Sequence, residues 1–157
     1  MPAPYYGLLA AAAAVIGLAV SVRMLRHRIT VVTVTGHSMH PTLSAGDRVL
    51  VRRGDISDLR PGQIVVFQSP ASDRTWTRWA IKRLVAVPGD PLPAEMMAAA
   101  DDTPGLVVPG PLVPPRKLLV MGDNTDESFD SRHFGFVPAE RLLGVAFRKL
   151  RENPPGR

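Results

Sequence analysis

The chain divides into an uncharged apolar stretch near its N-terminus and a longer part in which short apolar runs alternate with turns. Residues 5–22, YYGLLAAAAAVIGLAVSV, carry no charged side chain, and three arginines follow by residue 28. A helix needs about 17 to 25 residues to cross a bilayer, and tyrosine and arginine are enriched at the two interfaces. The pattern therefore predicts one transmembrane helix with a basic flank, a membrane anchor over residues 1–28.

Two other interpretations of this stretch are weaker. A cleavable signal peptide carries positive charge before its apolar core, and the leading residues MPAPYY carry none. A buried helix of a soluble protein usually keeps one polar face. The arginines that follow the stretch favour a cytoplasmic location for the rest of the chain.

After residue 28 the apolar positions recur with the short period of β-strands. Runs rich in β-branched residues, each ending at turn residues, cover 29–36, 47–54, 62–70, 75–90 and 116–124, and GVAFRKL is a further run after a helical turn in PAERLL. Short strands without long helices between them predict an antiparallel barrel or sandwich. The predicted fold class is mainly β, in one domain over residues 29–150.

Two segments depart from the strand pattern. Residues 91–115 are rich in proline and alanine and show no clear period, which predicts a short surface insertion. The end of the chain, residues 151–157, is expected to be a disordered tail. The 16 prolines and 13 glycines of the whole chain favour turns over a helical bundle.

Composition excludes several kinds of site. With no cysteine, the chain has no disulfide, thiolate nucleophile or cysteine-based metal site. The net charge of +5 allows attraction to phosphate, but aromatic residues make up only 6% of the chain and the arginines are scattered, which argues against nucleic-acid binding. No metal-ligand spacing or phosphate-binding glycine loop stands out. No metal or other cofactor is therefore expected.

The stretch GHSMHPTL, residues 36–43, places one serine between two histidines. A serine nucleophile needs a base within about 2.6–3.2 Å of its hydroxyl. In an extended segment His37 would face away from Ser38, and His40 precedes a proline that favours extended backbone. A turn serine that caps a short helix is the plainer interpretation.

A second candidate base is Lys82, in the apolar run WAIKRLVAV. A solvated lysine would be ordinary there. If the side chain instead faces an apolar pocket, burial would lower its pKa from about 10.4 towards the 7–8 that a base needs near neutral pH. Arg83 would then face the opposite side of the strand.

The third feature is GDNTDESFDSRHFG, residues 122–135, which can be an acidic turn stabilised by its own side chains. Asp130 and Arg132 could form a bidentate ion pair that fixes the loop. Ser128 could hydrogen-bond an amine. His133 with Asp130 could also complete a Ser–His–Asp set with Ser38.

Four stretches in order, GHSMHPTL, GDRVLV, KRLVAVPGD and GDNTDESFDSRHFGFVP, resemble the motifs of type I signal peptidases. These are membrane-bound serine proteases that remove leader peptides from exported proteins. The motifs lie within residues 36–90 and 122–138 and cover a minority of the chain. The resemblance implies a β-rich catalytic core behind one transmembrane helix, without the large second domain that some relatives carry.

The resemblance also implies roles for individual residues. Ser38 would be the nucleophile, Lys82 the general base, and Ser128 would hydrogen-bond the lysine amine. Three residues would brace the last motif behind the site: Asp123, Asp130 and Arg132. The Ser38 N–H would form part of the oxyanion hole. Some members carry a second donor, a serine, where this chain has Gly36.

Substrate specificity follows from the same resemblance. The substrate would lie extended beside residues 31–35 and the strand of Lys82, with small residues, typically alanine, one and three positions before the cut. By family position the pockets would be lined by Val34, Met39, Leu43, Ala80 and Ile81. The expected partners are leader-bearing precursors and the lipid bilayer, not nucleic acid, and the enzyme is expected to be a monomer.

The implied location is the plasma membrane, with a single span and the catalytic domain on the extracytoplasmic face. This conflicts with the arginines after the span, which favour the reverse orientation. Two other functions stay open: a dedicated maturation protease for one precursor, and an inactive membrane-anchored binding module. Self-cleavage after Ala98-Ala99-Ala100 is a further hypothesis from the sequence.

Overall fold

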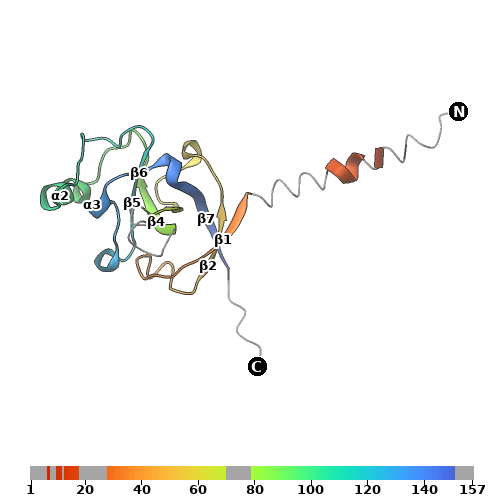
Figure 1. The fold of residues 1–157 in the computed structure, drawn as a ribbon, viewed down its shortest axis with the longest axis horizontal. Helices are drawn as coiled ribbons and strands as arrows, with labels where there is room; N and C mark the ends of the chain where they lie inside the picture. The colour runs from red at the N-terminus through yellow and green to blue at the C-terminus, as the bar shows by residue number, and fades with distance from the viewer. Residues whose placement is uncertain (1–6, 8–9, 12, 18–27, 70–78, 151–157) are drawn as a thin grey trace, which may run out of the picture.

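The described part of the protein is built around one antiparallel sheet (Figure 1). The computed structural model describes residues 28–69 and 79–150, with residues 7, 10–11 and 13–17 near the N-terminus. Seven strands follow the order β1-β2-β7-β3-β4-β5-β6. They are β1 (Ile29–Thr33), β2 (Arg48–Arg52), β3 (Ile64–Gln68), β4 (Trp79–Ala86), β5 (Lys117–Met121), β6 (Val137–Pro138) and β7 (Leu142–Leu150). The prediction of a mainly β fold is confirmed. The strands form one antiparallel sheet and not the two packed sheets of a sandwich.

Strand β3 shows why the sequence of a central strand is an unbroken run of apolar residues. It pairs with β4 on one side and β7 on the other, and its middle residues Val65, Val66 and Phe67 are all fully buried. Val65 and Phe67 pack in one apolar cluster with Leu84, whereas Val66 packs in a second cluster. Both faces of β3 are therefore covered, so alternation with polar residues is lost.

The second cluster is completed by the segment that follows β1. Met39 and Leu43, in the loop between β1 and β2, are buried there against Val49 and Val51 of β2. Each buried large side chain contributes about 1.5–3 kcal/mol relative to exposure. The loop that carries Ser38 is thus held on the sheet by its own apolar side chains.

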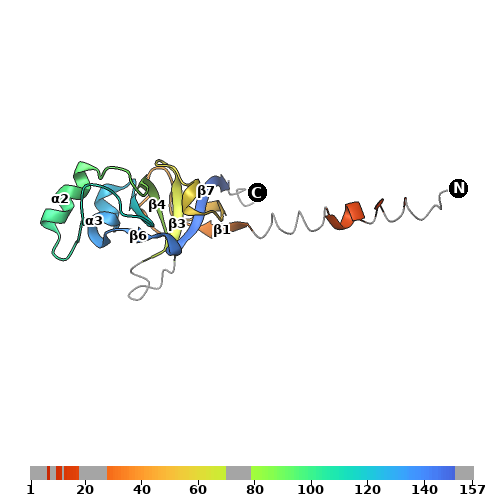
Figure 2. The ribbon, with the colours of Figure 1, turned by 90° about the horizontal axis from the view of Figure 1, so that it is seen from above.

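The predicted insertion at residues 91–115 contains a helix that the sequence pattern did not indicate. Helix α2 (Ala94–Asp102) contacts the short helix α3 (Ser131–Phe134), and both lie at the end of the sheet away from β1 (Figure 2). The helix is alanine-rich, which favours helical backbone. Only Met96 is buried, so no apolar stripe marks the helix in the sequence.

The described residues also contain three single-turn 3₁₀ elements: η1 (Ile56–Asp58), η3 (Thr125–Glu127) and η4 (Ala139–Arg141). The helical turn predicted in PAERLL is η4, directly before β7. Among the described residues there is no helix long and apolar enough to cross a membrane. Most of the predicted anchor, and the whole predicted tail at 151–157, lie outside the described residues.

Candidate active site

Ser38 and Lys82 line the same cavity, which has a volume of about 270 Å³. One wall is the end of β1 and the residues after it, 32–36, and the other is the first half of β4, 79–82. Within the described residues, β5 pairs with β4 from Arg83 to Ala86. The curled sheet therefore brings its edge strand β1 opposite a part of β4 that β5 does not cover. A cavity between two strand edges can accept an extended peptide.

The backbone around Ser38 is fixed by hydrogen bonds as well as by apolar packing. The Ser38 carbonyl accepts a hydrogen bond from the Asn124 N–H at 3.0 Å, and the His37 carbonyl accepts one from the Asn124 side chain at 3.3 Å. Asn124 follows β5, so these bonds join the first motif to the last. The nucleophile candidate is consequently held by a segment more than 80 residues away in sequence.

Gly122 lies where three parts of the site meet. A Cβ atom at this position would come within 3.0 Å of the Ser128 hydroxyl oxygen and the Ser38 carbonyl oxygen. Real Cβ atoms essentially never approach other atoms so closely. The missing side chain of Gly122 therefore lets the end of β5 contact Ser38 and Ser128 together.

Lys82 faces the apolar interior of the sheet, which supports the interpretation of a buried amine over that of a solvated lysine. It points to the same side of β4 as Leu84, and it is only 5% exposed. Burial lowers the pKa of the Lys82 amine from 10.5 to about 8, with an opposing effect of Asp130 and a smaller supporting effect of Arg132. A substantial neutral fraction thus exists near neutral pH.

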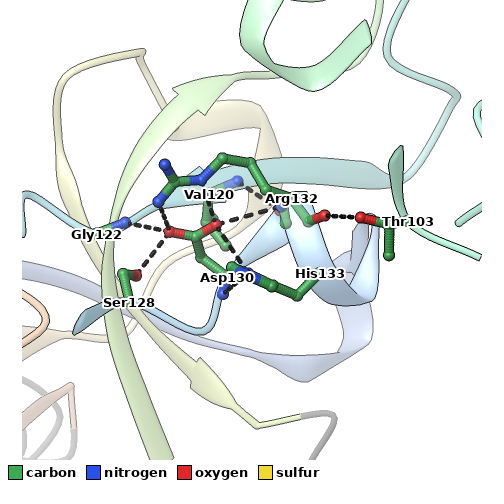
Figure 3. A network of polar contacts seen from close by, with 8 residues as sticks. Thr103, Val120, Gly122, Ser128, Asp130, Arg132 and His133 are labelled. Carbon is green, nitrogen blue, oxygen red and sulfur yellow. Dashed lines mark hydrogen bonds and ion pairs between the residues drawn. The ribbon is translucent and has the colours of Figure 1, made fainter. Parts of the chain in front are cut away.

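Asp130 is the centre of a polar network (Figure 3), and its charge also acts on Lys82. The predicted bidentate pair is formed: Arg132 donates from Nε to Oδ1 at 2.9 Å and from Nη2 to Oδ2 at 2.7 Å. Oδ2 also accepts from the Ser128 hydroxyl at 2.6 Å and the Gly122 N–H at 2.9 Å. Burial alone would raise the pKa of Asp130, but these hydrogen bonds together hold it below its usual value.

This network has two consequences for the lysine. The positive charge of Arg132, paired with Asp130, offsets part of the attraction by which Asp130 favours the protonated form of Lys82. The Ser128 hydroxyl donates its hydrogen bond to Asp130, so the same oxygen can only accept a hydrogen bond from a further partner. An amine beside Ser128 would act as the donor towards it.

On the opposite side of β4, Arg83 joins four segments, as the strand alternation predicted for its direction. It donates to Asp123 at 2.7 and 2.6 Å, to the Gly62 carbonyl at 2.8 Å and to the Thr42 hydroxyl at 3.3 Å. Asp123 was predicted as a bracing residue; Arg83 and Thr42 were not. The pKa of Asp123 is held below its usual value, chiefly by the Arg83 hydrogen bonds.

The other predicted residues are distributed over the cavity and the core beneath it. Gly36, Val34, Ala80 and Ile81 line the cavity. Met39 and Leu43 lie in the buried cluster together with Val34 and Ile81. Two aromatic lining residues, Trp79 and Phe129, were not predicted. Their signal in the sequence is weak, because an aromatic residue in a strand or loop is usually part of a core.

No histidine is among the described residues that line the cavity. His37 and His40 are exposed in the loop around Ser38. His133 caps α3 instead: its Nδ1 accepts a hydrogen bond from the Asp130 N–H at 3.3 Å, and its ring stacks on Phe129. These three histidines thus lie around the candidate site, and the buried titratable amine in the cavity is that of Lys82.

Comparison with known proteins identifies the family. A family model described as "Signal peptidase, peptidase S26" matches residues 6–98 and 94–150, which is most of the chain. The chain belongs to this family. The four motifs lie within the residues that this family model matches.

Individual signal peptidases are similar over about 70% of the chain. A probable signal peptidase I-2 of Synechocystis sp. is 34% identical over 125 residues, covering 70% of this chain and 57% of that protein. Signal peptidases I of Leptolyngbya laminosa and Bacillus caldolyticus are 30% and 31% identical, with 64% and 76% of their lengths covered. The chain thus spans less than two thirds of the first two relatives. A solved signal peptidase I of Enterococcus faecalis matches 57% of this chain and 97% of that one, at 24% identity and a TM-score of 0.41.

Proposed function

We propose that the protein is a serine endopeptidase that removes N-terminal signal or leader peptides from exported precursors, cutting after small residues of the Ala-x-Ala type. The observation that carries the proposal is the buried Lys82, with its pKa lowered to about 8, in the same cavity as Ser38. The family match and the signal peptidase names of the similar proteins support the substrate class.

The proposed reaction uses Lys82 as base and Ser38 as nucleophile. The neutral amine takes the Ser38 hydroxyl proton while Oγ attacks the scissile carbonyl carbon, giving a tetrahedral oxyanion. The C–N bond then breaks, and the lysine ammonium passes the proton to the leaving amine. Water attacks the resulting ester, again with its proton going to Lys82, and the proton returns to Ser38 Oγ as the product acid leaves.

Ser128 is proposed to orient the base. Its proton is directed to Asp130, so it would accept an N–H from Lys82. A neutral amine has one lone pair, and fixing one N–H restricts where that lone pair points. Asp130 and Arg132 would hold Ser128, and the Arg83–Asp123 pair would hold β4 and the end of β5 in register.

The proposed enzyme is anchored in the plasma membrane by residues 1–28, as a single-pass protein with the catalytic domain on the extracytoplasmic face. The arginines after the apolar stretch oppose this orientation. Long translocated domains tolerate such charges, and we give the four motifs more weight. The proposed partners are leader-bearing precursors and the bilayer, with the enzyme acting as a monomer.

The proposal is tested with the full chain in detergent and synthetic leader peptides that contain Ala-x-Ala. Wild-type protein is expected to cut once, after the second alanine of the motif, and Ser38→Ala to abolish the cut because the nucleophile is lost. His37→Ala, His40→Ala and His133→Ala are expected to keep most of the activity. Loss of cleavage in a histidine variant, with Lys82→Met still active, would contradict the Ser/Lys assignment.

The pH dependence of cleavage follows from the lysine. Because only the neutral amine is a base, kcat/KM is expected to rise about tenfold per pH unit at low pH and to level off above a pKa of about 8. The profile is measured with one Ala-x-Ala peptide across this range. A profile controlled by a group titrating near 6.5, the ordinary histidine value, would argue against Lys82.

Gly36 offers a gain-of-function prediction. No atom lies within 4 Å of the position that its Cβ would occupy, so a serine fits there. If position 36 borders the oxyanion, the Gly36→Ser hydroxyl should stabilise it and raise kcat by up to about 100- to 1,000-fold, since a lost oxyanion donor costs about 2.7–4 kcal/mol. Gly54→Ser, at an equally open glycine, is the control. An unchanged kcat in Gly36→Ser would remove position 36 from the oxyanion hole.

A further inference from the structure

An exposed aromatic side chain, Phe129, lines the same cavity as Ser38 and Lys82. It is 57% exposed although the residues on either side of it, Ser128 and Asp130, are buried. An apolar ring of this size is usually buried, or is exposed where it contacts a partner. Its position in the cavity points to the substrate as that partner.

The ring of Phe129 is fixed in place before any substrate arrives. It stacks on His133 with ring centroids 5.2 Å apart and packs against Phe134 at 5.6 Å. Phe134 in turn packs against the fully buried Phe67, at 6.5 Å. A chain of aromatic contacts thus runs from the core to the cavity. A ring held in this way loses little conformational entropy when a ligand packs on it.

The two faces of β4 decide which substrate residue Phe129 would meet. Ile81 packs on the cluster that contains Met39 and Val34. Ala80 packs on the opposite cluster, with Phe67 and Phe134. Because Phe129 contacts Phe134, it lies on the Ala80 side of the strand.

In the proposed function, on which this inference rests, the substrate lies as a strand beside β4. Its residues one and three before the cut would face the pockets on the Ile81 side. Side chains alternate along a strand, so the residue between them, two before the cut, faces Ala80 and Phe129. Ala80, assigned by family position to the pockets, thus lies on the other side of the strand from Ile81. Ala80 is small and leaves the space beside the Phe129 ring to the substrate.

We propose that Phe129 is a specificity-determining residue that selects a large apolar side chain two positions before the cut. A leucine or phenylalanine there would pack on the ring, whereas serine or glycine would leave it in water. An apolar contact of this size corresponds to a preference of about tenfold in kcat/KM. The substrates favoured would be Ala-Leu-Ala or Ala-Phe-Ala leaders over Ala-Ser-Ala leaders.

The test uses peptides that differ only at this position, leucine against serine, with full-length protein in detergent. Wild type is expected to favour leucine about tenfold in kcat/KM, Phe129→Ala to reduce the ratio to about one, and Phe129→Tyr to restore it. Phe147→Ala is the matched control, because Phe147 is 51% exposed and outside this cavity. The pH profile should be the same in wild type and Phe129→Ala if the ring does not act through Ser128.

Two results would overturn the proposal: a leucine-to-serine ratio that Phe129→Ala leaves unchanged, whether or not both rates fall, or a changed preference at the residue after the cut. If Phe129→Ala loses cleavage only when the protein is in lipid vesicles, the ring contacts the membrane instead of the substrate. Binding of fluorescent peptides to Ser38→Ala protein, with and without Phe129→Ala, gives the same comparison without catalysis. Failure of wild type to cut any leader peptide, with the leucine preference kept in binding, would refute the proposed function alone.

Discussion

Replacing Lys82 by methionine is expected to abolish leader-peptide cleavage and to make the folded protein more stable at pH 7. Methionine has a similar length and no basic group, so the loss of kcat should reach about four orders of magnitude. The stability gain arises because the folded protein holds this amine in an apolar site that disfavours its charge. The lowering of the pKa from 10.5 to about 8 corresponds to about 3 kcal/mol in the free energy of unfolding at pH 7.

The sign of the stability effect fixes its pH window. The pKa of Lys82 is lower in the folded state, so between about 8 and 10.5 the unfolded chain binds more protons and stability rises with pH. Below this pH range the wild-type protein is destabilised by the full free-energy cost of burying the charged amine, and Lys82→Met does not have this cost. The gain should therefore be largest below pH 8 and vanish above pH 10.5. Denaturant unfolding at several pH values measures it.

Lys149→Met provides the control for both measurements. Lys149 is 47% exposed and pairs with Asp47 on the surface. Such pairs contribute at most about 1 kcal/mol, so its loss should leave kcat unchanged and slightly lower the stability. A Lys82→Met protein that cleaves within tenfold of wild type would rule out the lysine as base. An inactive variant that is also less stable would indicate damage to the fold instead.

The substitution Gly122→Ala is expected to reduce kcat about 100- to 1,000-fold. The new methyl group would overlap the Ser38 carbonyl and the Ser128 side chain, and the backbone carbonyl cannot rotate away. Ser38 and Ser128 would be pushed apart, which separates the nucleophile from the group that orients its base. Overpacking of this kind costs about 1–3 kcal/mol of stability.

Cleavage kinetics and denaturant unfolding test Gly122→Ala against Gly54→Ala. Gly54 has no atom within 4 Å of its would-be Cβ and lies in the loop after β2, so its replacement should change neither property. Kinetics are measured under conditions where the variant is fully folded. We expect kcat to fall by more than the lost stability can explain. Full activity in Gly122→Ala would show that Ser38 and Ser128 need not be held this closely.

Local features were predictable from the sequence because strands impose a period of two. In WAIKRLVAV that period places Lys82 on the side of Leu84, so burial of its amine is one of the two interpretations that the pattern allows. The Asp130–Arg132 pair was likewise predictable, since the two residues are neighbours in one loop. Helix α2 was not, because it buries a single side chain, Met96.

Long-range features could not be predicted from one sequence. Arg83 contacts Thr42 and Asp123, which lie about 40 residues away in opposite directions, and no local pattern specifies such pairings. The placement of β1 opposite β4 depends on the curl of the whole sheet. The cavity wall at Phe129 depends on the packing of Phe134 against the core. These contacts arise from the tertiary packing.

The lowered pKa of Lys82 also makes this side chain a target for chemical labelling. Amine-reactive reagents attack the neutral amine, and at pH 7 to 8 an ordinary lysine is almost entirely protonated. Lys82 has a pKa of about 8 and opens into the cavity, so a small electrophile carried by an Ala-x-Ala peptide would reach a reactive amine there. A covalent probe aimed at the base, in place of the serine, is therefore a realistic design for this protein.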